Sequence, residues 1–202
     1  MKNKNKNNYL CMLRNKFGPF KLQYLERKED GSVNRTKRYK LIWFFKSNID
    51  DQEAGRRNWM FNKMNQRTLL KNELVLDIDD KNKKQARLRL LHLLNHKKII
   101  NVFENRDYKG SKLIIKYFQV FESNSGYHIH ILYHRPINDI YRRHIINNIK
   151  RITSNKMIDY QIKSNHMIAL EYTNHWKNKN LIKIPVKNID TRIKKRWLNY
   201  EK

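Results

Sequence analysis

The chain has 202 residues, and its 45 Lys and Arg residues outnumber the 18 Asp and Glu residues, which gives a formal net charge of +27. Such an excess of cations indicates a polyanionic partner, with nucleic acid the leading candidate and an anionic membrane surface the rival. No apolar run approaches the ~18 residues of a membrane-spanning helix, no signal-peptide core follows the N-terminus, and one cysteine excludes a Cys-cluster zinc site, so we expect a cytoplasmic protein.

The first part of the chain predicts a tail followed by two strands and a helix. Residues 1–8 are a Lys/Asn repeat, which is typical of a disordered basic tail, and residues 9–202 show no linker or composition boundary, which favours one domain. Strands are expected over 20–25 and 39–45, and a helix over 51–65.

The second part of the chain predicts alternating strands and helices. The helix expected over 80–97 has Leu88, Leu91 and Leu94 along one side and basic residues on the other. The remaining elements are strands over 73–79, 113–121 and 127–133, a helix over 138–152, a hairpin of 167–172 with 181–186, and a basic helical tail that contains Trp197. The fold class is therefore α+β.

Two carboxylates follow each other at the end of the strand over 73–79. Asp77 and Asp79 are two residues apart, so they point to the same face of the strand. Two like charges that close repel each other unless a cation lies between them or water screens them. Mg²⁺ is commonly held by one or two carboxylates together with substrate phosphates. The pair predicts a metal-assisted phosphoryl-transfer site, although an Asp-rich turn before a helix explains the same residues.

A small-residue turn followed by two histidines is the second feature. Ser123, Asn124, Ser125 and Gly126 form a tight turn whose backbone amides are suited to a phosphate, and His128 and His130 share one face of the next strand. The alternative is that His128 is only a hydrogen-bonded residue of the sheet, but two His at i and i+2 after such a turn favour the functional interpretation.

The third feature is a polar stretch from residue 159 to residue 185. It contains Asp159, Asn165, His166, Glu171, His175 and Lys177. A third carboxylate here would complete a metal site begun by Asp77 and Asp79. His175 and Lys177 share a strand face and are suited to a triphosphate, although a solvated hairpin explains them equally well.

The order of these three features resembles that of the archaeo-eukaryotic primase superfamily. Residues 72–79 look like its first motif and residues 123–128 like its second. The third region is similar to the primase small subunit, with a metal-binding Asp at Asp159, an Asn-His pair at 165–166, a His-x-Lys at 175–177 and a strand that ends near Pro185. The resemblance spans about residues 72–186.

The resemblance implies a DNA-dependent primase or polymerase, a nucleotidyltransferase whose RRM-like sheet carries the acidic and His motifs with helices packed on it. Asp77, Asp79 and Asp159 would hold two Mg²⁺ or Mn²⁺ ions, which assist attack by a 3′-hydroxyl and departure of pyrophosphate. Nucleoside triphosphates would be gripped by the following residues: Ser123, His128, His166, His175, Lys177 and Arg56. The implied partners are a single-stranded DNA template and a large primase subunit or helicase, with no membrane, and the implied location is the nucleoid or replication site.

The chain departs from the family pattern in three places. The second motif often has basic residues in its turn, where this chain has Asn124 and Ser125. Many small subunits carry a zinc knuckle, which Cys11 alone cannot build, so no structural zinc is expected. Glu171 is the alternative to Asp159 as third carboxylate. Arg56 and its neighbour Arg57 lie early in the helix expected over 51–65. A solvated position near the start of that helix explains them as well as a phosphate contact does.

A competing interpretation is a rolling-circle replication initiator. His128, Ile129 and His130 also resemble the His-hydrophobe-His motif of those nicking enzymes, and Tyr160 to Lys163 fits their Tyr-x-x-Lys pattern. That chemistry cleaves DNA through a tyrosine. It leaves Asp77, Asp79, His175 and Lys177 without a role, so we favour the primase interpretation. A basic binding module without catalysis would explain the charge but not the clustered acids and histidines.

The net charge predicts a steep salt dependence of nucleic-acid binding. Affinity for single-stranded DNA should fall as salt rises, because bound Lys and Arg residues release counterions from the phosphates. Fluorescence anisotropy of a labelled oligonucleotide over a salt series measures the slope. A flat response would show that the +27 charge reflects biased composition alone.

Overall fold

The computed structural model divides into two compact units of mixed secondary structure. The described residues are 2–26, 28, 30, 32, 41–47, 49–50, 61, 63–80, 82–104, 110–153, 166–174, 180–186 and 189. Unit 1 comprises residues 1–70 and 165–184, and unit 2 comprises residues 71–164 and 185–202. Each unit contains an antiparallel sheet, so the predicted α+β class is confirmed, and the sequence had indicated one domain where two units are found.

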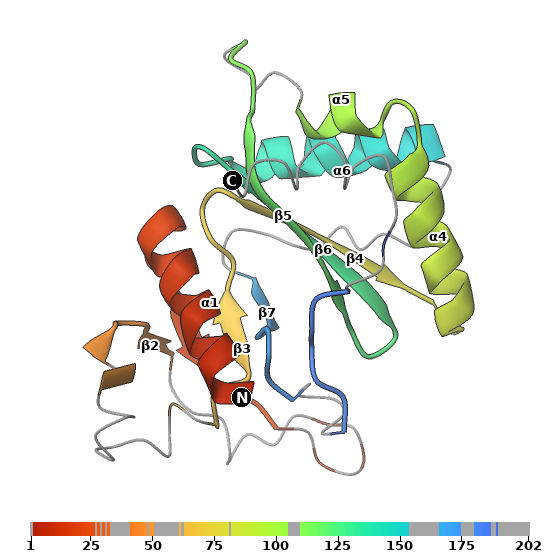
Figure 1. The fold of residues 1–202 in the computed structure, drawn as a ribbon. Coiled ribbons are helices and arrows are strands. Elements are labelled where there is room, and N and C mark those ends of the chain that lie inside the picture. The colour runs from red at the N-terminus through yellow and green to blue at the C-terminus, as the bar shows by residue number, and fades with distance from the viewer. Residues whose placement is uncertain are drawn as a thin grey trace. The chain divides into compact units, whose positions relative to one another are not determined.

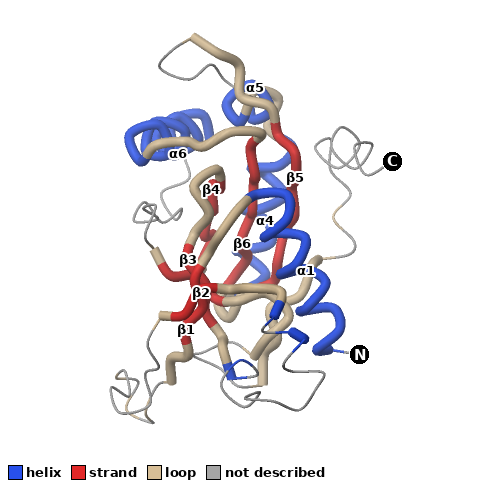
Figure 2. The backbone as a smooth tube through the Cα atoms, turned by 90° about the vertical axis from the view of Figure 1, so that its left-hand side faces the viewer, coloured by secondary structure: helices blue, strands red, loops and turns tan. Residues whose placement is uncertain are grey.

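Unit 2 is built on a three-stranded antiparallel sheet in the order β4-β6-β5. The strands are β4 (Glu73–Asp79), β5 (Ile115–Glu122) and β6 (Gly126–Tyr133). They lie side by side in both views (Figure 1; Figure 2). Each overlaps the strand that the sequence predicted, because all three are rich in β-branched or other large apolar residues, with aromatic residues in β5 and β6.

Three helices of unit 2 cover one face of this sheet. They are α4 (Lys83–Asn95), α5 (Ile99–Phe103) and α6 (Asp139–Thr153), and α4 contacts both β4 and β6 (Figure 1). The buried core between helices and sheet includes Leu74, Leu76, Ile78, Ile129, Ile131, Leu90, Leu93, Leu94, Phe103, Ile145 and Ile149. The even-numbered residues of β4 therefore face the helices, and its odd-numbered residues face the other way.

The predicted apolar side of α4 needs a correction. Its buried residues are Ala86, Leu90, Leu93 and Leu94, which are spaced four, seven and eight residues from the first. Leu88 is 58% exposed, and Leu91 is only partly buried. Residues at every third position, such as Leu88, Leu91 and Leu94, do not stay on one side of a helix that has 3.6 residues per turn. The buried residues are spaced by four, three and one, which keeps them on one side.

The start of β4 is fixed by a buried arginine of α6. The Arg142 guanidinium donates to the carbonyl oxygens of Lys71 (2.7 Å) and Glu73 (2.9 Å), and it also pairs with Asp139 (2.7 Å). Burial lowers the pKa of Arg142 from its usual value, and the nearby Asp139 and Glu73 carboxylates oppose that shift. These contacts hold the backbone from which the carboxylates of β4 project.

The turn between β5 and β6 is closed by Ser123 and Gly126. The Ser123 amide donates to the Gly126 carbonyl oxygen (2.9 Å), and the Ser123 hydroxyl accepts from the Gly126 amide (3.2 Å). A Cβ atom at Gly126 would overlap the carbonyl oxygen of Ile78 on β4. Glycine is required here because the two backbones approach so closely.

Unit 1 holds a four-stranded antiparallel sheet in the order β2-β1-β3-β7. Its strands are short: β1 (Lys21–Gln23), β2 (Ile42–Trp43), β3 (Gln66–Thr68) and β7 (Met167–Ala169). The sequence did not predict β3, because its Gln-Arg-Thr segment has no alternation of apolar and polar residues. The hairpin expected from residues 167–172 and 181–186 is present as backbone pairing of Tyr172 and Thr173 with Lys183.

A helix, α1 (Lys2–Phe17), stands where the sequence predicted a disordered tail over residues 1–8. It buries Tyr9, Leu10 and Leu13. Lys6 is also buried, and its ammonium donates to the Phe61 carbonyl oxygen (3.2 Å). Burial lowers the pKa of Lys6 to about 8. The Lys/Asn composition concealed the helix because its apolar residues begin only at Tyr9.

Some predicted elements fall on residues that the structure does not describe. These are positions 51–60 of the expected helix over 51–65, positions 39–40 of the expected strand over 39–45, and the C-terminal tail with Trp197.

Substitution of Gly126 tests the close approach of β6 to β4. Gly126→Ala should lower the free energy of unfolding by about 1–3 kcal/mol, the usual cost of overpacking, because backbone atoms must move. Thermal unfolding followed by circular dichroism measures the loss as a lower Tm. Ser125→Ala in the same turn is the matched control and should stay within about 0.5 kcal/mol of the unmutated chain. An unchanged Tm for Gly126→Ala would contradict the described pairing.

Candidate functional site

The face of the unit 2 sheet opposite the helices carries an unusual set of ionisable side chains. Glu73, Asp77 and Asp79 of β4 project to this face, since they alternate with the core residues. In the antiparallel register, Asp77 lies directly opposite His128, and Asp79 lies opposite Gly126. The sheet therefore brings Asp77 and Asp79 of the acidic motif next to His128 of the His motif.

One acid–histidine pair on this face is sealed from solvent. His130 Nδ1 lies 2.8 Å from Glu73 Oε1, and both side chains are 0% exposed. The His130 ring also meets Phe121 edge-on, with 5.0 Å between ring centroids. A buried carboxylate and imidazole that satisfy each other fix the sheet at this point. Sequence reasoning gave Glu73 no role, although its spacing of four residues from Asp77, an even number, already placed it on this face.

A second pair lies two residues nearer the turn and is partly open. His128 Nε2 lies 3.2 Å from Asp77 Oδ1, and their side chains are 10% and 25% exposed. The other ring nitrogen of His128, Nδ1, is buried and has no hydrogen-bond partner within the described part of the chain. His128 is therefore less committed to internal hydrogen bonds than His130, whose Nδ1 is paired with Glu73.

The two carboxylates at this end fit part of a divalent-cation site. Asp77 and Asp79 are neighbours on one face and both retain partial exposure, and carboxylate oxygens are the donors that Mg²⁺ prefers. No group of three or more His, Cys, Asp or Glu side chains with suitable geometry occurs among the described residues. The remaining oxygens would come from a substrate phosphate or from Asp159, which lies outside the described residues.

Basic side chains from α4 flank the same end of the sheet. Arg89 pairs with Asp80 (2.8 Å), the residue after β4. Lys83 pairs with Glu122, and its ammonium also donates to the Ser123 carbonyl oxygen (3.4 Å). The first turn of α4 contains no acidic residue. This end of the sheet therefore carries carboxylates together with the cations Arg89 and Lys83, which favour an anionic ligand.

Among the other predicted site residues, the structure describes Ser123, His166 and Glu171. The hydroxyl and the amide of Ser123 both serve the turn, as set out above. His166 is exposed in unit 1 and its carbonyl oxygen accepts from the Leu69 amide (3.1 Å). The predicted residues outside the described part are Arg56, Arg57, Asp159, Tyr160, Asn165, His175 and Lys177.

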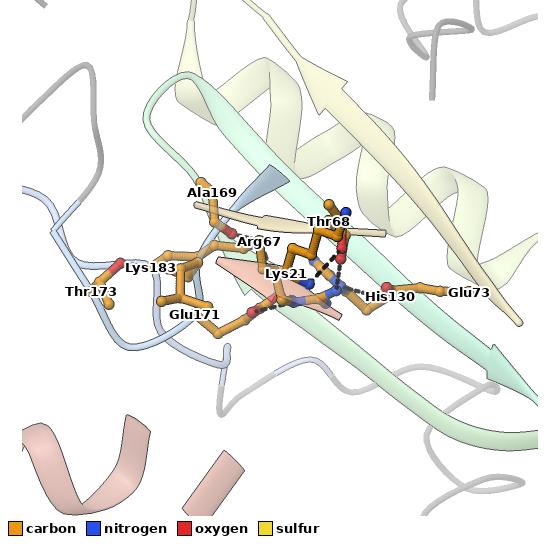
Figure 3. A network of polar contacts seen from close by, with 10 residues as sticks. Lys21, Arg67, Thr68, Glu73, His130, Ala169, Glu171, Thr173 and Lys183 are labelled. Carbon is orange, nitrogen blue, oxygen red and sulfur yellow. Dashed lines mark hydrogen bonds and ion pairs between the residues drawn. The ribbon is translucent and has the colours of Figure 1, made fainter. Parts of the chain in front are cut away.

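Glu171, the alternative third carboxylate, is the centre of a buried ionic cluster in unit 1. Arg67 binds it with two parallel hydrogen bonds of 2.9 Å, and the Lys183 ammonium lies 3.3 Å from Oε1 (Figure 3). Lys183 also donates to the Ala169 carbonyl oxygen (2.8 Å). All three side chains are 0% exposed. A role as metal ligand would require Glu171 to give up these contacts, so the geometry favours a structural role.

No protein-family model, no curated protein and no solved structure matches the chain. None of the described helices combines the length and the apolar character that crossing a bilayer takes. The primase resemblance is thus a hypothesis carried by the residues named above.

The ionic cluster predicts a large stability effect. Glu171→Ala should lower the free energy of unfolding by about 3–5 kcal/mol, because it leaves the Arg67 and Lys183 cations buried without their carboxylate. Denaturant unfolding measures the change. Glu122→Ala is the control: it breaks the exposed pair with Lys83 and should cost about 0–1 kcal/mol. Equal effects of the two variants would show that the cluster is not structural.

Proposed function

We propose that the chain is a metal-dependent nucleotidyltransferase of the primase–polymerase type, which adds nucleotides on a single-stranded DNA template. The observation that carries the proposal is the grouping of Asp77, Asp79 and His128 on one sheet face, at the end where side chains remain partly exposed. Mg²⁺ or Mn²⁺ is the implied cofactor, and a nucleoside triphosphate is the implied substrate.

The topology of unit 2 supports this proposal. Its elements follow the order strand, helices, strand, strand, helix, and its sheet order is β4-β6-β5. This is the arrangement of the first three strands of a β-α-β-β-α-β, or RRM-like, domain. Since the described helices of unit 2 lie on the other face, and Asp77 and Asp79 are partly exposed, a ligand could reach the turn end of the acidic face.

The chemistry assigns each group a distinct task. Asp77 and Asp79 would hold a divalent cation, which when bound neutralises charge on the transferring phosphate and lowers the barrier to attack by a hydroxyl. His128 lies against Asp77 with its second ring nitrogen directed elsewhere, so it can orient a phosphate oxygen next to the cation. Asp159, His175 and Lys177 complete the proposal as the third metal ligand and the triphosphate contacts. A large primase subunit or helicase is the proposed protein partner.

The rolling-circle interpretation needs two histidines that share a metal ion. His130 is fully buried and its Nδ1 is committed to Glu73, whereas only His128 is partly exposed. This difference in exposure favours the primase interpretation, in which one histidine serves the substrate.

Substitution of the carboxylates tests the proposal. Asp77→Asn and Asp79→Asn should each reduce incorporation of labelled nucleotides on single-stranded DNA with Mn²⁺ or Mg²⁺ to background, since the metal loses a charged ligand. His128→Ala should reduce incorporation about ten- to hundredfold, because a charge-assisted hydrogen bond contributes roughly 1.5–3 kcal/mol. Asp30→Asn, in an exposed turn of unit 1, is the matched control. Retained activity in either carboxylate variant, with the fold intact by circular dichroism, would remove the proposal's main support.

The same assay separates the two enzyme classes through Tyr160. A primase should keep most of its activity in Tyr160→Phe, because only a hydroxyl is lost, and should lose nucleotide use in Lys177→Ala. A nicking enzyme should form a covalent adduct with DNA that Tyr160→Phe eliminates. Denaturing gels of the unmutated protein with labelled DNA detect such an adduct, and its presence would overturn the primase proposal.

A further inference from the structure

An edge strand of unit 1 exposes apolar side chains on alternate residues. Leu41, Trp43 and Phe45 are 44%, 47% and 52% exposed, and Phe44 between the last two is buried. We call Leu41, Trp43 and Phe45 the aromatic edge. Residues i and i+2 of an extended segment share a face about 7 Å apart, so the three side chains form a row. Strand β2, which lies within this row, is the outermost strand of its sheet among the described strands.

The row is held in place from behind. The Phe44 ring stacks on Phe20, with 5.1 Å between centroids, and on Phe61, with 6.1 Å. The Phe44 amide donates to the Phe20 carbonyl oxygen (3.0 Å). Phe44 thus anchors the backbone of the aromatic edge, and Trp43 and Phe45 project from a fixed support. Ligands gain affinity from such preorganisation because little entropy is lost when they bind.

A cation is built into the same surface. Lys21 of β1 pairs directly with Trp43 in the sheet register, and its ammonium lies 4.6 Å from the centroid of a Trp43 ring. Lys46 follows Phe45 and is exposed. The nearest acid in sequence among the described residues, Asp50, lies four residues after Lys46. Aromatic faces beside ammonium groups match the bases and phosphates of a nucleic-acid strand, respectively.

Leaving these side chains exposed has a cost that points to a ligand. Burial of one such side chain is worth about 1.5–3 kcal/mol, and an exposed apolar edge strand invites aggregation. The net charge of +27 repels other copies of this chain and attracts polyanions. A lipid surface would need a larger apolar area than three side chains offer, whereas successive bases need only single ring faces.

We propose that the aromatic edge, with Lys21, is a base-stacking platform for single-stranded nucleic acid. This inference deepens the proposed function and rests on its claim that a single strand is the partner. It assigns the single-stranded nucleic acid to a surface of unit 1 that includes neither the acidic motif nor the His motif. Stacking accepts any base, so the platform binds without sequence preference, and DNA and RNA arms of the test distinguish the sugar.

Equilibrium binding of the full chain to fluorescein-labelled dT and rU 20-mers tests the platform. Trp43→Ala and Phe45→Ala should each weaken binding about five- to hundredfold, the range expected for loss of one stacked base. Trp43→Phe should stay within about threefold because it keeps a ring. Ile140→Ala is the matched control, since Ile140 is an 80% exposed apolar residue of α6 in unit 2. Lys21→Met should reduce the salt slope by about one.

A second measurement does not depend on Trp43→Ala folding correctly. Titration with dT should quench the tryptophan emission of the unmutated chain, and Trp43→Phe should lose most of that quenching while it still binds. Binding by Trp43→Ala and Phe45→Ala at the unmutated affinity would overturn the inference, as would equal weakening by Ile140→Ala. Quenching of Trp43 by anionic vesicles but not by oligonucleotides would assign the platform to a membrane and overturn it too.

The outcomes also separate this inference from the proposed function. Trp43-dependent binding without nucleotide incorporation would sustain the platform and refute the nucleotidyltransferase. Incorporation that depends on Asp77, together with binding that ignores Trp43, would sustain the enzyme and refute the platform.

Discussion

The register between β4 and β6 is the constraint on which the candidate site depends. It places Asp77 opposite His128 and Asp79 opposite Gly126, and it sends Leu74, Leu76 and Ile78 into the core. A slip of one residue would bury the carboxylates among leucines and expose the leucines instead. Two features oppose such a slip. The Gly126 backbone approaches Ile78 at a distance that no other residue permits, and Arg142 holds the carbonyl oxygens at the start of β4.

The two acid–histidine pairs differ in burial. The buried pair, Glu73 with His130, stabilises the sheet, and the partly exposed pair, Asp77 with His128, is the one that we propose for ligand binding. Glu73 and His130 are sealed, so any change in charge there would leave an uncompensated group in the interior. Asp77 and His128 retain contact with solvent, so an incoming cation or phosphate can exchange for water at their surface. The two pairs thus combine the same chemical groups, a carboxylate and an imidazole, and it is their exposure that makes the Asp77–His128 pair the candidate for binding a ligand.

The sequence predicted the site strands well because their pattern is local. The apolar residues of 73–79 predict β4, and the small-residue turn at 123–126 predicts that β5 and β6 are joined as neighbours. Other features could not be predicted from the sequence, because they depend on contacts between residues that are far apart in the chain. The strand β3 is polar and forms only beside β1 and β7, and the Arg67–Glu171 pair joins residues 104 positions apart.

The helix α1 shows a different reason why a prediction from the sequence was wrong. Its first turns are rich in Lys and Asn, which is the composition of a disordered segment, yet the apolar residues from Tyr9 onward dock the helix in unit 1. For α4 the helix was predicted but its buried side was not, because the five leucines between residues 88 and 94 allow more than one apolar side. Only the packing against β4 and β6 selects Leu90, Leu93 and Leu94.

The positive charge of the chain and the acids of the site act over different distances. At physiological ionic strength the field of an exposed charge decays over about 8 Å, so most of the +27 charge does not reach the Asp77 carboxylate. Locally, Arg89 and Lys83 are cations that the described part of the chain places at this end of the sheet, beside the His128 imidazole. In the proposed function, the overall charge would therefore raise the rate at which a polyanion meets the protein, whereas the balance between the two carboxylates and their neighbouring cations would decide what binds at the site.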